Sequence, residues 1–243
     1  MAQRKRRRQR RSPWFIPAVV LGAIVTVLII VAVALTVGGP GQDLPQNTSG
    51  IRVDYTDVDP MDLGQGLCID HVGNYTGIYM EDGSNDVVSG ILMTIVKNTG
   101  EKDLQLARFS LKYGDVTAEF EVTNLPAGES VVVLEKNRRS VSGKPESANL
   151  STALFFEEKM TLLEEKVELS GQKGSIGVKN ISGEDISGTV WVYYKYSATD
   201  LFYGGITFRA KLTGGLKAGA SANIPAGHYD PNSVKLLWVT VEG

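Results

Sequence analysis

Residues 116–130 read VTAEFEVTNLPAGES, and this stretch decides the fold class of the chain. In its first part apolar and polar side chains alternate, with Val116, Ala118, Phe120 and Val122 at every second position. Successive side chains of a β-strand point to opposite faces, so the pattern predicts a strand with one buried and one solvated face. Such strands are typical of antiparallel sheets.

Comparable segments recur along the chain, separated by turn-forming residues at intervals of about ten residues, which is the rhythm of a β-sandwich. We expect further strands at residues 90–96, 106–113, 189–196, 206–212 and 234–241. Residues 150–169 are predicted to be mainly strand, although their Glu, Lys and Leu content also favours a short helical turn at residues 160–165. The chain is therefore predicted to be all-β.

Short motifs repeat between the two halves of the chain. Val-Lys-Asn ends a segment at Asn98 and again at Asn180. Leu-x-Ala-Gly-x-Ser then follows an alternating strand, with its glycine at Gly128 and again at Gly219. Asn stabilises turns through hydrogen bonds to nearby backbone, and Gly adopts turn conformations that other residues disfavour. The repeat predicts two tandem sandwiches, at residues 51–148 and 149–243, rather than one barrel.

A strand ending Val-x-Asn-x-Gly, then an alternating strand, then Leu-x-Ala-Gly-x-Ser resembles bacterial Ig-like surface modules of the CARDB kind, named for cell adhesion. The resemblance covers most of residues 86–243. It implies tandem Ig-like antiparallel β-sandwiches in a cell-surface setting, and it carries over no catalytic residue. Residues 51–80 have no counterpart in this pattern, and we expect them to add strands of their own.

An uncharged stretch, PWFIPAVVLGAIVTVLIIVAVALTVGG, precedes the predicted sandwiches at residues 13–39. At about 1.5 Å per residue, its apolar part matches the roughly 30 Å hydrocarbon core of a bilayer. We expect one transmembrane signal-anchor helix at residues 13–38 and a flexible Gly- and Pro-rich linker at residues 39–50. A signal peptide cleaved after the small residues at 32–34 is the alternative that the sequence leaves open.

The head of the chain, at residues 1–12, is strongly basic. It contains seven of the 25 Lys and Arg residues and none of the 27 Asp and Glu residues. The positive-inside rule places this head in the cytoplasm and the rest of the chain outside. The remainder is acidic, which argues against a nucleic-acid partner. The expected partners are the lipid bilayer, through residues 13–38, and an unknown protein or cell-wall component.

Cys68 is the only cysteine, so the predicted outer part has no intrachain disulfide. Secreted domains of oxidising compartments usually carry disulfides, and their absence favours the cell membrane of a Gram-positive bacterium. Four Asn-x-Ser/Thr sequences, at Asn47, Asn74, Asn149 and Asn180, point the other way, since they are glycosylation sequences in secreted eukaryotic proteins. We give the missing disulfides more weight.

No residue is predicted to be catalytic or to bind a cofactor or a metal. Cys68 and His71 are three apart, a spacing that places them on opposite faces of a strand, and we expect a buried structural cysteine. Aspartates cluster at residues 54–62 and 82–86, and calcium favours such oxygen ligands. The second cluster lacks the Gly and Glu of an EF-hand loop, and turn chemistry explains it.

Aromatic residues of the second half are the candidates for partner contact. Trp191 and Tyr193 share one face of their predicted strand. Leu201, Phe202 and Tyr203 follow in a predicted turn, near its tip, where apolar side chains either meet a partner or fold back to close the end of the sandwich.

We therefore predict a non-enzymatic, membrane-anchored extracytoplasmic protein that acts by binding or by spacing, through protein or envelope-matrix contacts. The alternative is an accessory subunit of an envelope transport, secretion or cell-wall assembly complex, with helix contacts at the small residues Ala18 and Gly22.

Overall fold

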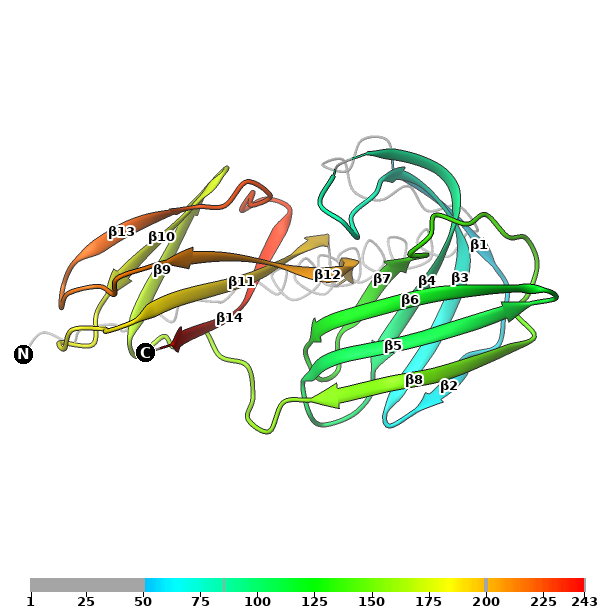
Figure 1. Ribbon diagram of the computed structural model, residues 1–243, viewed down its shortest axis with the longest axis horizontal. Coiled ribbons are helices and arrows are strands. Elements are labelled where there is room, and N and C mark those ends of the chain that lie inside the picture. Colours follow the sequence, from blue (N-terminus) through cyan, green and yellow to red (C-terminus); the bar gives the residue numbers. More distant parts are fainter. Residues whose placement is uncertain (1–50, 85, 199–200, 243) are drawn as a thin grey trace, which may run out of the picture. The chain divides into compact units, whose positions relative to one another are not determined.

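A computed structural model describes residues 51–84, 86–198 and 201–242 (Figure 1). Every regular element of this part of the chain is a strand, so the expected all-β class is confirmed. The strands, in chain order, are β1 (Arg52–Thr56), β2 (Met61–Gly64), β3 (Leu67–Ile78), β4 (Val87–Asn98), β5 (Leu104–Tyr113), β6 (Val116–Leu125), β7 (Ser130–Leu134), β8 (Ser147–Phe155), β9 (Val167–Gln172), β10 (Ser175–Asn180), β11 (Thr189–Ala198), β12 (Leu201–Leu212), β13 (Ser221–Pro225) and β14 (Val234–Glu242).

The basic head, the predicted anchor and the linker, at residues 1–12, 13–38 and 39–50, lie outside the described residues. Among the residues that are described, no helix has the length and apolar character needed to span a bilayer.

The strands form three sheets. The largest has eight strands, in the order β1-β3-β4-β7-β12-β11-β14 with β2 also paired to β3. Two sheets of three strands have the orders β6-β5-β8 and β13-β10-β9. Neighbouring strands are antiparallel with one exception, the short parallel pairing of β7 with β12. Strands β1–β8 make up the first half of the fold and strands β9–β14 make up the second half.

The alternating segments fold as the sequence predicts. Strands β4, β5, β6, β11, β12 and β14 coincide with or extend the expected ones, and residues 51–80 add β1, β2 and β3. The boundary predicted between residues 148 and 149 falls inside β8, which pairs with β5 along most of its length.

Residues 150–169 are less regular than predicted. The strand ends at Phe155 and the next begins at Val167, with loop and turns between them and no helix at residues 160–165. The reason is a set of bonds to Asp103. Its backbone carbonyl accepts from Phe156 N–H (2.9 Å), and its carboxylate accepts from Met160 N–H (2.7 Å). These contacts hold the segment against the end of β5 instead of in a ladder.

Two cores lie between facing sheets. In the first half, β6-β5-β8 covers strands β3, β4 and β7 (Figure 1). The rings of Phe109 and Phe120 stack at 5.1 Å between these layers. In the second half, β13-β10-β9 covers β11, β12 and β14 around residues such as Ile176 and Val192. Both cores consist of the inward positions of alternating strands, as expected for packed sheets.

Residues 91–96 of β4 and strand β7 are buried on both faces. Val131 and Val133 of β7 belong to the first-half core, whereas Val132 and Leu134 point the other way into a third cluster with Met93 of β4. A strand segment that is covered on both faces has no solvated positions, which explains why residues 91–96 are apolar apart from the buried Thr94.

The repeated motifs form equivalent turns. Asn98 and Asn180 are both fully buried at the ends of β4 and β10. The backbone N–H groups of Gly128 and Gly219 donate to the carbonyl oxygens of Asn98 and Asn180, at 2.8 and 3.1 Å. Gly128 and Gly219 have φ angles of 81° and 72°, a conformation that favours glycine. The roles predicted for these four residues are confirmed.

Side chains of the second half complete cores of the first. Phe202 of β12 and Leu237 of β14 belong to the first-half core, and Tyr203 of β12 belongs to the third cluster. The contact includes the pairing of Phe202 and Tyr203 with Val131 and Val132 of β7. The two halves therefore share apolar packing.

Candidate functional site

Trp191 and Tyr193 share one face of β11, as predicted, and it is the outer face, a choice that the sequence left open. They are half-buried, whereas Val190, Val192 and Tyr194 point into the second-half core. The neighbouring strands on this face are β12 and β14, so side chains of three strands meet here.

Two cations flank Trp191. The guanidinium carbon of Arg209 lies 4.5 Å from the centre of the indole ring and the ammonium nitrogen of Lys211 lies 5.6 Å from it. The indole N–H donates to a carboxylate oxygen of Glu242 at 3.0 Å. We name Trp191, Tyr193, Arg209 and Lys211 the Trp191 patch. Its cations are exposed, and neither forms an ion pair with a carboxylate of the described residues.

Aromatic rings extend this patch towards β14. Tyr193 stacks on Trp238 at 5.0 Å, and Phe156 meets Trp238 edge-on at 4.6 Å. A shallow hollow of about 340 Å³ lies beside them, lined in part by Phe156, Trp238 and Lys166. Ring stacks of this kind stabilise a sheet face and also present flat apolar surface beside charged groups.

Residues 201–203 do not lie in the predicted turn, and two of their three side chains are buried. Leu201 begins β12 instead of lying in a turn, and Phe202 and Tyr203 are 2% and 3% exposed. The reason is that both rings enter apolar clusters of the first half, which fits the alternative that these side chains fold back. The structure does not bring Phe202 and Tyr203 to the surface with Trp191.

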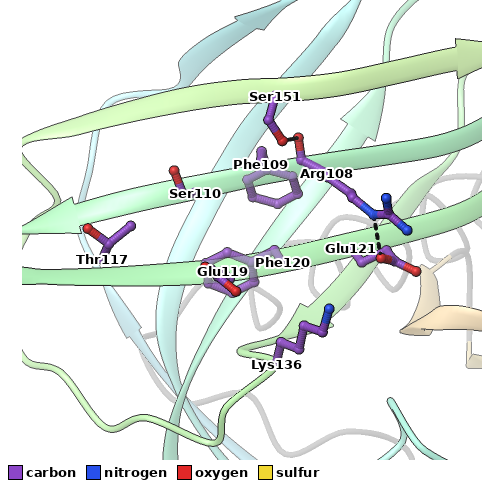
Figure 2. A pocket seen from close by; sticks show the side chains of 9 residues that line it. All are labelled: Arg108, Phe109, Ser110, Thr117, Glu119, Phe120, Glu121, Lys136 and Ser151. Atoms are coloured by element: carbon purple, nitrogen blue, oxygen red, sulfur yellow. Dashed lines mark hydrogen bonds and ion pairs between the residues drawn. The ribbon is translucent and has the colours of Figure 1, made fainter.

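A second hollow, of about 310 Å³, lies on the outer face of β5 and β6 (Figure 2). Arg108 points along this face and forms an ion pair with Glu121 at 2.7 Å, while the Ser151 hydroxyl donates to the Arg108 carbonyl oxygen at 2.9 Å. The buried rings of Phe109 and Phe120 lie beneath it.

Cys68 and His71 both lie on the outer side of β3, contrary to the expectation of opposite faces. Cys68 alternates with the buried Leu67 and Ile69 and is half-buried, instead of buried. A bulge between Ile69 and His71 then shifts the alternation and brings the exposed His71 to the same side. The Cys68 thiol donates to Asp70 at 3.6 Å. Burial raises the pKa of this thiol, and the Asp70 carboxylate raises it further. A protonated thiol is a poor nucleophile.

The acidic clusters take part in turns and ion pairs. Asp82 accepts from the backbone N–H of Ser84 at 2.8 Å, and Arg138 forms ion pairs with Asp82 (2.7 Å) and Asp86 (3.0 Å). A hydrogen bond from the Ser84 side chain, together with the one from its backbone and the Arg138 cation, lowers the pKa of Asp82. Within the described part of the chain, no group of three or more His, Cys, Asp or Glu residues is arranged to hold a metal ion.

One buried polar cluster was not predicted. Lys195, in β11, is 0% exposed, and its ammonium group donates to the carbonyl oxygens of Gly204, Gly205 and Ile206. The carboxylate of Glu81 accepts from N–H groups of the same segment. Burial lowers the pKa of Lys195 to about 7, an effect that the Glu81 carboxylate opposes, and burial raises the pKa of Glu81. Two features of the sequence could have indicated this cluster: a lysine between Tyr194 and Tyr196, and the adjacent glycines Gly204 and Gly205.

Comparisons of the chain with protein-family models, with curated proteins and with solved structures give no match.

Proposed function

We propose that this protein is a non-enzymatic binding or structural protein of the cell envelope. In this proposal residues 13–38 anchor it in the membrane, residues 1–12 lie in the cytoplasm, and two tandem Ig-like sandwiches lie outside. The equivalent turns at Asn98 and Asn180 support the tandem arrangement, and the resemblance to CARDB-type modules agrees with it.

The Trp191 patch is the observation that carries the proposal. Two exposed cations without a carboxylate partner among the described residues flank a half-buried ring, in a chain whose outer part is acidic. Their charge is complementary to an acidic partner, and aromatic rings offer flat surface for contact. We propose that the patch binds a phosphate- or carboxylate-bearing polysaccharide of the envelope.

Binding is tested with the full-length protein in lipid nanodiscs. The probe is a polyglycerol phosphate polymer, with neutral dextran as its control. We expect binding to the polyanion that weakens as salt rises, because salt screens exposed charges. The double variant Arg209→Gln/Lys211→Gln should lose about tenfold in affinity. The matched variant Lys144→Gln/Lys173→Gln, at exposed lysines elsewhere, should bind as the wild type does.

Equal binding by both double variants would remove the patch from the proposal. No binding to the polyanion, together with recovery of an envelope transport or assembly complex that depends on residues 13–38, would favour the accessory-subunit alternative. Replacement of these residues by an unrelated membrane helix tests that dependence.

A further inference from the structure

Strand β12 leaves its regular pairing with β11 opposite Lys195. Tyr194 pairs with Phe208 and Tyr196 pairs with Tyr203, so Lys195 alone faces residues 204–207. The backbone of one residue cannot form the interstrand hydrogen bonds of all four residues opposite it. Buried backbone groups nevertheless need hydrogen-bond partners. The bulge at residues 204–207 must therefore be satisfied from elsewhere.

Two charged side chains supply those partners. Lys195 Nζ donates to the carbonyl oxygens of Gly204 (2.9 Å), Gly205 (2.7 Å) and Ile206 (2.6 Å). The carboxylate of Glu81 accepts from Gly205 N–H at 2.7 and 2.8 Å and from Ile206 N–H at 3.2 Å. Lys195 thus donates hydrogen bonds to the carbonyl groups of the bulge, and Glu81 accepts hydrogen bonds from its N–H groups.

Glu81 also reaches β7. One of its oxygens accepts from the backbone N–H of Leu134 at 2.8 Å. A single carboxylate therefore bonds to β7 of the first half and to β12 of the second half, next to the place where those strands pair at Val132 and Tyr203. Through its side-chain hydrogen bonds, Glu81 thus extends the connection between β7 and β12 beyond the residues that pair through their backbones.

The bulge fits closely against β6. A Cβ atom on Gly205 would overlap the carbonyl oxygen of Glu121, so only glycine fits at this position. The Thr207 hydroxyl donates to the carbonyl oxygen of Thr123 at 2.9 Å. The path of β12 is thus specified by contacts with β6 and β7 of the first half and with Lys195 of the second.

We propose that Glu81 and Lys195 form a conformational lock that fixes the path of β12 and makes the two halves unfold as one unit. Apolar contacts of Phe202 and Leu237 also join the halves, but apolar burial is non-directional and does not satisfy the backbone N–H and carbonyl groups of the bulge. Buried charges are costly to desolvate and serve best to select one arrangement. The lock goes beyond the proposed binding function, because it concerns how the halves are held and not what they bind.

The test is hydrogen exchange of the full-length protein in detergent micelles, followed by mass spectrometry over a series of urea concentrations. In the wild type, peptides of β5–β6 and of β10–β13 should lose protection together. In Glu81→Gln and in Lys195→Met, the two sets should separate, and peptides covering Leu134 and residues 204–206 should exchange at least about tenfold faster, since their hydrogen bonds are weakened.

The matched control is Glu129→Gln. Glu129 of the first half pairs with Lys235 of the second at 3.3 Å on the surface, so it also joins the halves. Exposed ion pairs contribute little, and this variant should behave as the wild type. If the Lys195→Met variant does not fold, hydrogen exchange of the near-isosteric Glu81→Gln variant is sufficient to test the proposal. The proposal is overturned if the halves of the wild type already lose protection separately, or if they stay coupled in Glu81→Gln.

Discussion

Asn98 and Asn180 make the same hydrogen bonds in the two halves of the chain. The amide nitrogen of Asn98 donates to the carbonyl oxygens of Lys102 (3.0 Å) and Leu125 (3.1 Å). That of Asn180 donates to Glu184 (2.7 Å) and Leu216 (2.9 Å). Each side-chain oxygen accepts from the N–H two residues further on.

We predict that Asn98→Ala and Asn180→Ala each lower the free energy of unfolding by about 2–4 kcal/mol, because each leaves two carbonyl groups without their donor. Chemical unfolding followed by circular dichroism measures the loss. Asn149→Ala, at an exposed position of β8, is the control and should change stability by less than about 0.5 kcal/mol. A small effect at one asparagine and a large one at the other would contradict their equivalence.

The hydroxyl groups of Tyr79 and Tyr113 predict opposite outcomes for the same substitution. Tyr79 donates to the Lys136 carbonyl oxygen at 3.0 Å, whereas the buried Tyr113 hydroxyl has no partner among the described residues. Tyr79→Phe should destabilise the protein by about 1 kcal/mol, and Tyr113→Phe should be neutral or stabilising. Thermal melts of both variants side by side give the comparison. A matched loss in both would indicate that the Tyr113 hydroxyl has a partner.

Alkaline pH should destabilise the protein through its buried tyrosines. Burial raises the pKa of Tyr79 and of Tyr113 from 10.0 to about 12. The folded state therefore keeps protons that the unfolded state releases, so their stabilising contribution is complete below pH 10 and is lost between pH 10 and 12. Each tyrosine adds at most about 1.4 kcal/mol per pH unit to this slope. Urea unfolding between pH 9 and 11.5 should show a shallower decline for Tyr113→Phe than for the wild type.

Alanine substitutions at Gly205 and Gly219 should destabilise the protein for different reasons, one steric and one conformational. Gly205→Ala places a Cβ on the carbonyl oxygen of Glu121, and a backbone atom cannot move aside cheaply. Gly219→Ala meets nothing within 4 Å and has only the cost of its φ angle of 72°. We expect a loss of about 1 kcal/mol for Gly219→Ala and more than about 3 kcal/mol for Gly205→Ala. Equal losses in chemical unfolding would contradict the close approach of β12 to β6.

Alternation predicted the strands well because one face of each is buried and the other solvated. In β6, the apolar positions Ala118, Phe120 and Val122 are the buried ones. The Asn and Gly turns were also predictable, since they depend on residues close in sequence. The Trp191 patch was predicted only through Trp191 and Tyr193. Its cations lie on β12, and their position depends on the pairing register.

Lys195 and Glu81 were missed for a physical reason. A lysine in a strand normally points to solvent, and nothing near Lys195 in the sequence shows that its partners are the carbonyl groups of a bulge in β12. Glu81 follows β3 and meets that bulge only through tertiary contact. The relation of Cys68 to His71 was misjudged because a bulge in β3, after Ile69, changes the face that His71 occupies, and alternation does not reveal bulges.

The positions of Phe202 and Leu237 bear on how the protein is made. Both complete the first-half core, yet both come from strands that are synthesised after the whole of the first half. The first half leaves the ribosome before these side chains have been added, so this core stays incomplete until β12 and β14 have emerged. Contacts so distant along the chain are slow to form. Such a nascent chain exposes apolar surface for an extended period, and its maturation should depend on chaperones that shield it.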